Sequence, residues 1–200
     1  MSQGYVSLLE SGRRPVPDRL VPCLRRAFGL PVTALPPRDT ANLDPSRLAG
    51  ALAALGYEAF AYLRGRPALN PAEVLLVALR QRDLESRLVE ALPWLVLRHA
   101  DLDWEWLVER AKVHDVQNRL GYVLTLAREV ADGHRDTSMA TRLRDLEGNL
   151  EPSRLAREDT LCHDSMTDAE RRWLREERPL RARHWNLLTD LDPAHLSYAR

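Results

Sequence analysis

Apolar residues recur every three or four positions along most of the chain, which is the spacing of an amphipathic helix. Leu, Ala, Arg and Glu, all good helix formers, dominate the composition. No Asn-Gly or Asp-Gly pair separates two alternating apolar and polar runs, so the pattern predicts no strand. We therefore expect an all-α fold. Its predicted helices cover residues 2–11, 17–28, 44–64, 70–79, 83–99, 103–131 and 167–177, with one or two more inside 132–160.

Residues that favour helix ends support this division. Ser2, Asp44 and Thr167 are suitable N-cap residues, and Thr167 is followed by a capping-box glutamate at Glu170. The tail from 184 to 198 is rich in Trp and Leu, so we expect it to dock on the core.

The proline-rich stretch at 31–42 is the clearest linker in the chain. It divides the sequence into an N-terminal segment at 1–37, a linker at 38–42 and a helical domain at 43–200, which we expect to serve dimerisation, sensing or partner binding.

Composition narrows the class of protein. The 200 residues are 44% hydrophobic and 29% charged, an ordinary globular mixture. No apolar run approaches the about 20 residues of a membrane span, so we expect a cytoplasmic protein without membrane contact. The 29 basic and 29 acidic residues balance, so no global basic charge points to nucleic acid. Arginine outnumbers lysine 28 to one, which we attribute to codon usage rather than to function.

Residues 2–15 carry the most specific pattern, Ser-Gln-Gly-Tyr-Val-Ser-Leu-Leu-Glu-Ser-Gly-Arg-Arg-Pro. This segment resembles the third helix of the Cro/repressor-type (XRE) helix-turn-helix family and the turn that follows it. The matching residues are Val6, Ser7, Glu10, Gly12, Arg13 and Arg14, with one residue fewer before Pro15 than the family has. The stretch from Leu20 to Leu35 looks like the fourth and a short fifth helix of that domain.

The resemblance implies sequence-specific binding of double-stranded operator DNA by a homodimer. Val6 and Leu9 would turn toward a core, and the opposite face of the helix would meet base edges in the major groove. The residues of that face are Ser2, Gln3, Gly4, Ser7 and Leu8. Tyr5, Arg13 and Arg14 suit phosphate contacts, which set the register of the complex without reading sequence.

The family's domain has five helices, and the first two should precede Ser2. The expected fold is therefore a partial helix-turn-helix domain, with its third to fifth helices, followed by a helical C-terminal domain. We expect the chain to be an N-terminal truncation of a longer protein. The two missing helices would position the recognition helix, so the sequence leaves open whether the chain as it stands binds DNA.

Other candidate sites are weaker. Trp104 is a candidate protein–protein contact, because Trp106 two positions later would turn inward and the two side chains would then point apart. Cys162 and His163 lack the spacing of a zinc site, so no metal is expected. The polar run at 114–119 fits a solvated helix face better than a groove. No phosphate-binding glycine loop or nucleophile signature is present, so we expect neither a cofactor nor an enzyme.

Two alternatives remain open. The chain could be an antitoxin, in which the N-terminal module binds its own promoter and the helical domain neutralises a toxin. From a different class, it could be an enzyme or a protein-interaction scaffold, in which case the extended protein would show no salt-sensitive DNA binding.

Overall fold

The structure is a computed structural model, and it describes residues 2–17, 20–34, 36–39, 44–63 and 69–199. The described chain is mostly helical, which confirms the predicted fold class. Its α-helices are α1 (Gln3–Glu10), α2 (Val21–Phe28), α3 (Pro45–Leu55), α4 (Pro71–Leu79), α5 (Ser86–Arg98), α6 (Trp104–Val113), α7 (Gln117–Gly133), α8 (Thr137–Leu150), α9 (Asp168–Glu177) and α10 (Leu180–His184). Short 3-10 turns lie at Glu58–Phe60, Glu151–Ser153, Pro193–His195 and Ser197–Ala199.

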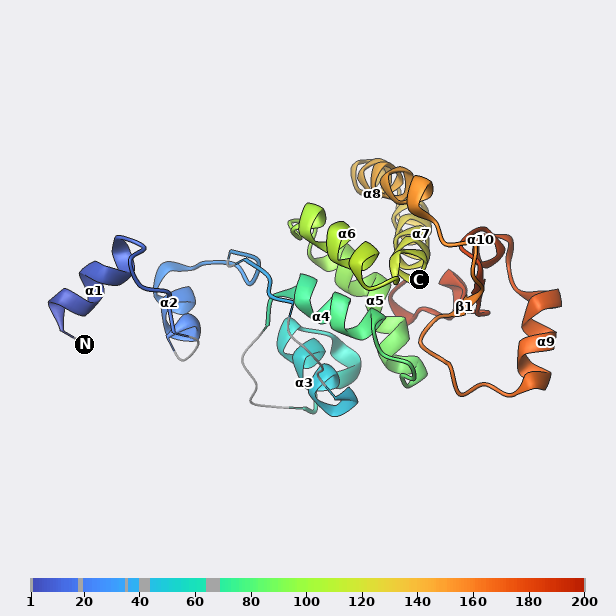
Figure 1. Cartoon of the computed structure of the whole chain (residues 1–200), viewed down its shortest axis with the longest axis horizontal. Helices are drawn as coiled ribbons and strands as arrows, with labels where there is room; N and C mark the ends of the chain where they lie inside the picture. Colours follow the sequence, from blue (N-terminus) through green and yellow to red (C-terminus); the bar gives the residue numbers. More distant parts are fainter. Residues whose placement is uncertain (1, 18–19, 35, 40–43, 64–68, 200) are drawn as a thin grey trace.

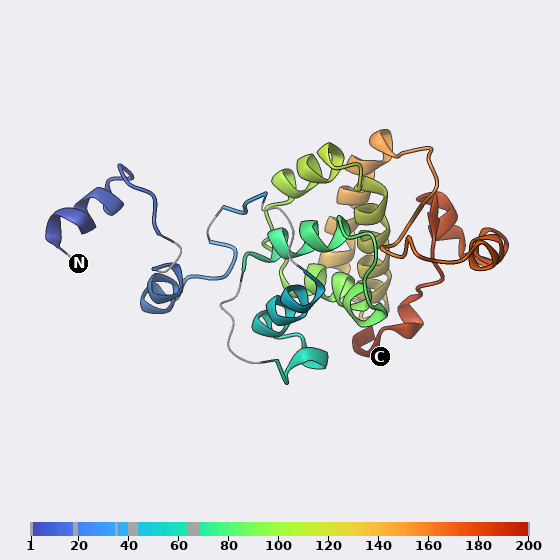
Figure 2. The same ribbon diagram turned by 60° about the horizontal axis from the view of Figure 1, so that its bottom comes forward.

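The helices α3 to α8 form the body of the molecule, and α1 and α2 project from one end of it as an arm (Figures 1 and 2). The helix α9 lies at the opposite end. The core of the body surrounds α4, whose nine residues are all buried, and α7, which packs against α5, α6 and α8. Apart from Glu73 the residues of α4 are apolar, and a helix with apolar residues all round requires neighbours all round, which explains its central place.

Local sequence signals set most helix starts. The Asp44 carboxylate accepts a hydrogen bond from the Arg47 amide at 3.0 Å, and the Asn70 side chain accepts one from the Ala72 amide at 2.9 Å. Thr167 begins α9 with the complete capping box that the sequence predicted. These bonds satisfy backbone amides that have no partner inside the first turn of a helix.

Two predicted helices differ from those in the structure, one because it ends early and one because it is divided in two. The helix predicted at 44–64 ends at Leu55, because Gly56 has a φ of 100° and stops the helix in a left-handed conformation. The single helix predicted at 103–131 is two helices, α6 and α7. Asp115 breaks it with a φ of 56°, and the Val116 amide bonds back to the Ala111 carbonyl at 2.9 Å. Aspartate is one of the few residues that tolerate this conformation.

The prediction of a short fifth helix before Leu35 is also wrong for the residues that the structure describes there. Val32 and Thr33 form a turn, while Leu35 itself lies outside the described part of the chain. A helix there would need to continue past Pro31 and into Pro36 and Pro37, and the residue before a proline is disfavoured in the helical conformation.

The prediction that the chain has no strand is wrong as well. Two short strands, β1 (Asp159–Thr160) and β2 (Leu187–Leu188), pair in parallel, with Asp159 opposite Leu187. The predicted docking of the tail is confirmed, since Trp185, Leu187 and Leu188 are buried. A strand of two residues is too short to show an alternating pattern in the sequence. The pairing itself depends on long-range contacts of the tail.

The tail meets α7 at Gly121. The Trp185 ring lies so close that a Cβ atom added at Gly121 would be 2.5 Å from it, and the indole Nε1 donates to the Thr125 hydroxyl at 3.0 Å. The glycine therefore makes room for the tryptophan that anchors the tail.

Candidate functional site

The helix α1 is delimited by its own sequence. Ser2 is extended, with φ −77° and ψ 152°, and its hydroxyl accepts a hydrogen bond from the Tyr5 amide at 3.4 Å. After Glu10 the chain turns at Gly12, which has a φ of 67°. The predicted helix at 2–11 is therefore present, and its predicted N-cap residue begins it.

The two faces of α1 differ in exposure. Tyr5, Val6 and Leu9 are half-buried, and none of the residues of the helix is fully buried. Ser2, Gln3, Gly4, Ser7 and Leu8 are all exposed. At 100° per residue Gln3, Gly4, Ser7 and Leu8 share one side of the helix, whereas Ser2, the N-cap residue, falls on the side of Val6 and Leu9. The structure thus places four of the five residues that the sequence assigned to base contacts on one open face, and Ser2 lies outside it.

Arg13 and Arg14 follow α1 and are both exposed. The Arg14 guanidinium lies over the Tyr5 ring at 5.0 Å from its centroid, and the Arg14 amide donates to the Leu8 carbonyl at 3.0 Å. A guanidinium at this distance is attracted to the face of the ring. Tyr5 and Arg14, both assigned to phosphate contacts, therefore lie beside each other at the border of the exposed face.

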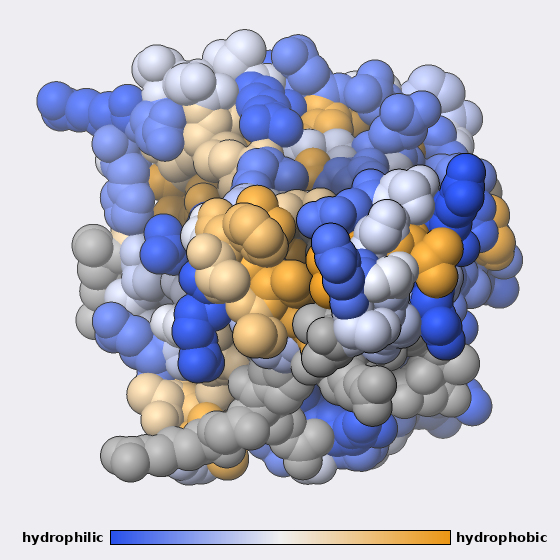
Figure 3. Space-filling model, turned by 90° about the vertical axis from the view of Figure 1, so that its left-hand side faces the viewer, coloured by the Kyte–Doolittle hydropathy of each residue, from blue (hydrophilic) through white to orange (hydrophobic). Residues whose placement is uncertain are grey.

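The second helix of the arm adds further positive charge. Arg25 and Arg26 lie in the last turn of α2, and Gly29 ends the helix with a φ of 62°. Phe28 is 70% exposed, and no residue of α2 is buried. Figure 3 views the molecule from the end where the arm projects, and hydrophobic residues gather near the centre of this face among hydrophilic ones.

Residues between the arm and the body form specific contacts. The Arg38 amide donates to the Glu73 carboxylate at 2.7 Å. Asp39 accepts from Arg80 at 3.0 Å and lies 2.8 Å from His114 Nε2. The His114 contact is the main reason that the pKa of Asp39 is lowered. The first two residues of the predicted linker at 38–42 thus contact the body; residues 40–42 lie outside the described residues.

The structure contradicts the predicted orientation of Trp104. Trp104 is only 8% exposed, and its indole Nε1 donates to the Ala100 carbonyl at 3.3 Å. Trp106, which was expected to turn inward, is the more exposed of the two. The two side chains do point apart, but in the opposite sense, so Trp104 belongs to the core and is not an exposed contact.

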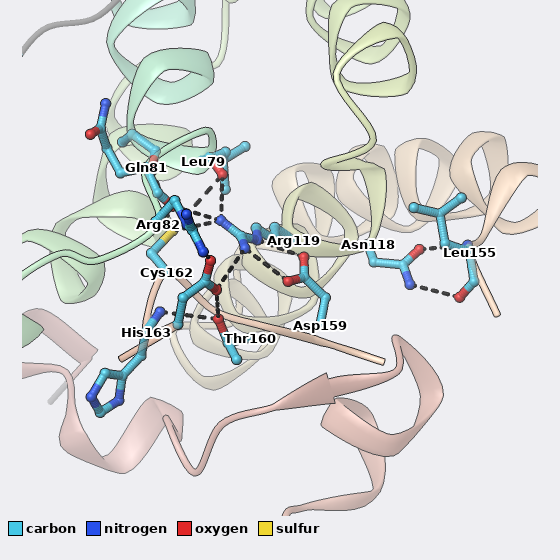
Figure 4. A network of polar contacts seen from close by, with 12 residues as sticks. Leu79, Gln81, Arg82, Asn118, Arg119, Leu155, Asp159, Thr160, Cys162 and His163 are labelled. Carbon is cyan, nitrogen blue, oxygen red and sulfur yellow. Dashed lines mark hydrogen bonds and ion pairs between the residues drawn. The ribbon is translucent and has the colours of Figure 1, made fainter. Parts of the chain in front are cut away.

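Sequence reasoning missed a buried polar network around Arg119 (Figure 4). The side chain of Arg119 is 7% exposed and makes a two-pronged contact with Asp159, at 2.7 and 2.8 Å. It also donates to the carbonyl oxygens of Leu79 and Gln81, at 3.0 and 2.7 Å. Burial raises the pKa of Asp159, but the hydrogen bonds and charge of Arg119 outweigh it and leave that pKa below its usual value.

The neighbours of Arg119 in the sequence are buried too. The Asn118 amide group donates to the Leu155 carbonyl at 2.9 Å and accepts from the Leu155 amide at 2.8 Å, as Figure 4 shows. Gln117 donates to the Ser153 carbonyl at 3.0 Å. The expectation of a solvated face at 117–119 is therefore wrong. These three side chains hold the segment after α8 against α7. The run of three polar residues at the start of an otherwise apolar helix was the sequence signal that could have indicated buried hydrogen bonds.

Cys162 and His163 lie beside this network and do not converge on a common site. The thiol of Cys162 is buried and donates to the Ala78 carbonyl at 3.4 Å, while the His163 side chain is exposed. Burial raises the pKa of Cys162 to about 11, which makes it a poor nucleophile. Within the described ranges, no three His, Cys, Asp or Glu residues lie where they could hold a metal ion.

Comparisons with protein families, with curated proteins and with solved structures found no match for this chain. Among the described residues, no helix combines the length and apolar character that crossing a membrane requires.

Proposed function

We propose that the chain binds double-stranded DNA through α1, as a sequence-specific transcriptional regulator of the helix-turn-helix type. The observation that carries the proposal is the exposed face of α1. It presents Gln3 in the first turn and Ser7 in the second as hydrogen-bond donors and acceptors, and Leu8 as an apolar contact for a thymine methyl group. Proteins of this class place a recognition helix in the major groove, and the N-terminal residues of that helix contact the base edges.

Charge supports the same surface. Residues 1–37 carry five arginines and two carboxylates, a formal charge of +3, whereas the whole chain is neutral. The positive charge is therefore concentrated in the arm, and the rest of the chain is net negative. Electrostatic attraction to phosphates would bring the arm rather than the body to the duplex.

The proposal includes a dimer. Two recognition helices bound to half-sites one helical turn apart would read a two-fold symmetric operator, with half-site centres about 10 base pairs apart. A single eight-residue helix has too few contacts for specific affinity, so a second copy of the arm would supply the rest.

A selection experiment tests the function. The full chain is incubated with duplexes of random sequence, bound duplexes are amplified, and the affinity for the enriched sequence is measured by fluorescence anisotropy. We expect a symmetric motif to emerge. Gln3→Ala should lose about 1–3 kcal/mol of discrimination at one base pair, whereas Asn149→Ala, an exposed amide on α8, should lose none. Failure to enrich any motif would contradict the proposal and favour the scaffold alternative.

A further inference from the structure

A cavity of about 350 Å³ lies between the start of α5, the segment after β1, the helix α9 and the C-terminal tail. It is separate from the arm, so it has no part in the proposed DNA contact. Its size falls within the range of small-molecule sites. The floor is formed by buried apolar side chains, chiefly Met166, Leu174 and Leu188, which make a small cluster of their own apart from the main core.

The charged residues that line this cavity are of one sign. Glu85, Glu90 and Asp190 line it, and no arginine or lysine is found among its described lining residues. His163, His195 and the buried thiol of Cys162 are the other titratable groups of its described lining, and the ring of His195 accepts a hydrogen bond from the Asp192 amide at 3.3 Å.

No ion pair or side-chain hydrogen bond of Glu85, Glu90 or Asp190 is found within the described part of the chain. By contrast, Asp159 and Glu158 each bind an arginine. Among the described arginines, none forms an ion pair with the carboxylates around this cavity, which border an apolar floor.

We propose that this cavity binds a small organic cation, an amine with an apolar body. The apolar part would cover Met166, Leu174 and Leu188, and the ammonium group would lie at the rim among the carboxylates. Burial of the apolar body would supply most of the affinity, and the carboxylates would select for positive charge. An anion of the same shape would meet three uncompensated negative charges and be rejected.

The test uses the full chain and three compounds of nearly equal size: 4-phenylbutylamine, 4-phenylbutanol and 4-phenylbutyrate. Binding is measured by isothermal titration calorimetry, with hexylamine and benzylamine as shorter amines. We expect the phenylbutylammonium ion to bind about tenfold more tightly than the alcohol, a difference of 1.4 kcal/mol. The carboxylate should not bind.

Two variants distinguish the contribution of the carboxylate charges to binding from that of the shape of the cavity. The double variant Glu90→Gln and Asp190→Asn should bring the affinity for the amine down to that of the alcohol, and Ser86→Trp, at the mouth of the cavity, should block both. Glu105→Gln, an exposed carboxylate on α6, is the matched control and should change neither affinity. Thermal unfolding and circular dichroism of each variant establish that it folds. Equal binding of all three compounds, or no binding of any amine at millimolar concentration to the folded wild-type chain, would overturn the proposal.

Discussion

Replacing Gly121 by alanine tests how the C-terminal tail is fastened to the body. The added Cβ would lie 2.5 Å from carbon atoms of the Trp185 ring, whereas carbon atoms in contact are normally about 3.5–4 Å apart. The ring would have to move by about 1 Å, which would also disturb its hydrogen bond to Thr125. Overpacking of this kind typically costs about 1–3 kcal/mol, and the lost hydrogen bond about 1 kcal/mol more.

A helix gains about 1 kcal/mol from a Gly→Ala change in its interior, so we expect Gly121→Ala to lower the free energy of unfolding by about 1–3 kcal/mol overall. Urea unfolding followed by tryptophan fluorescence measures this. Gly148→Ala is the matched control, because Gly148 is also helical but, apart from its chain neighbours and the backbone of its own helix, no described atom lies within 4 Å of its added Cβ. That variant should be more stable than the wild type. If Gly121→Ala were also more stable, the close approach of Trp185 would be refuted.

Three further predictions concern the buried network and the thiols. Arg119→Met should lower the free energy of unfolding by about 3 kcal/mol in urea, because it leaves the Asp159 carboxylate half-buried without its partner. Because the folded state lowers the pKa of Asp159, its contribution to stability is present above the unfolded pKa of about 3.9 and is lost as the pH falls through the lower folded value. The stability difference between wild type and Asp159→Asn should therefore shrink on acidification below pH about 4. In the native protein a thiol reagent should label the exposed Cys23 rapidly and the buried Cys162 slowly. Equal labelling rates would contradict the burial of Cys162.

Short-range signals were read correctly from the sequence. The capping residues Ser2, Asp44 and Thr167 act within three residues of themselves, so the sequence alone identifies them. Val6 and Leu9, which were expected to face a core, are half-buried, and no residue of α1 is fully buried.

The features that were missed depend on distant partners. The burial of Arg119 requires Asp159, forty positions later, and the carbonyl groups at the end of α4. The strands β1 and β2 exist because the tail returns to the segment after α8. The orientation of Trp104 depended on which side of α6 meets the core, and with two tryptophans two positions apart the sequence allowed either choice.

The salt dependence of DNA affinity tests the central claim most directly. The affinity for the selected duplex is measured over a range of salt concentrations, for the wild type and for the double variant Arg13→Ala and Arg14→Ala. The slope of log K against log salt changes by about 0.9 for each phosphate contact, so loss of both arginines should make the slope less steep by about 2. The charge-matched control, Arg142→Ala with Arg172→Ala, removes two exposed arginines from α8 and α9 and should leave the slope unchanged. A slope that is equally steep in both double variants, or affinity that does not depend on salt, would contradict DNA binding through α1.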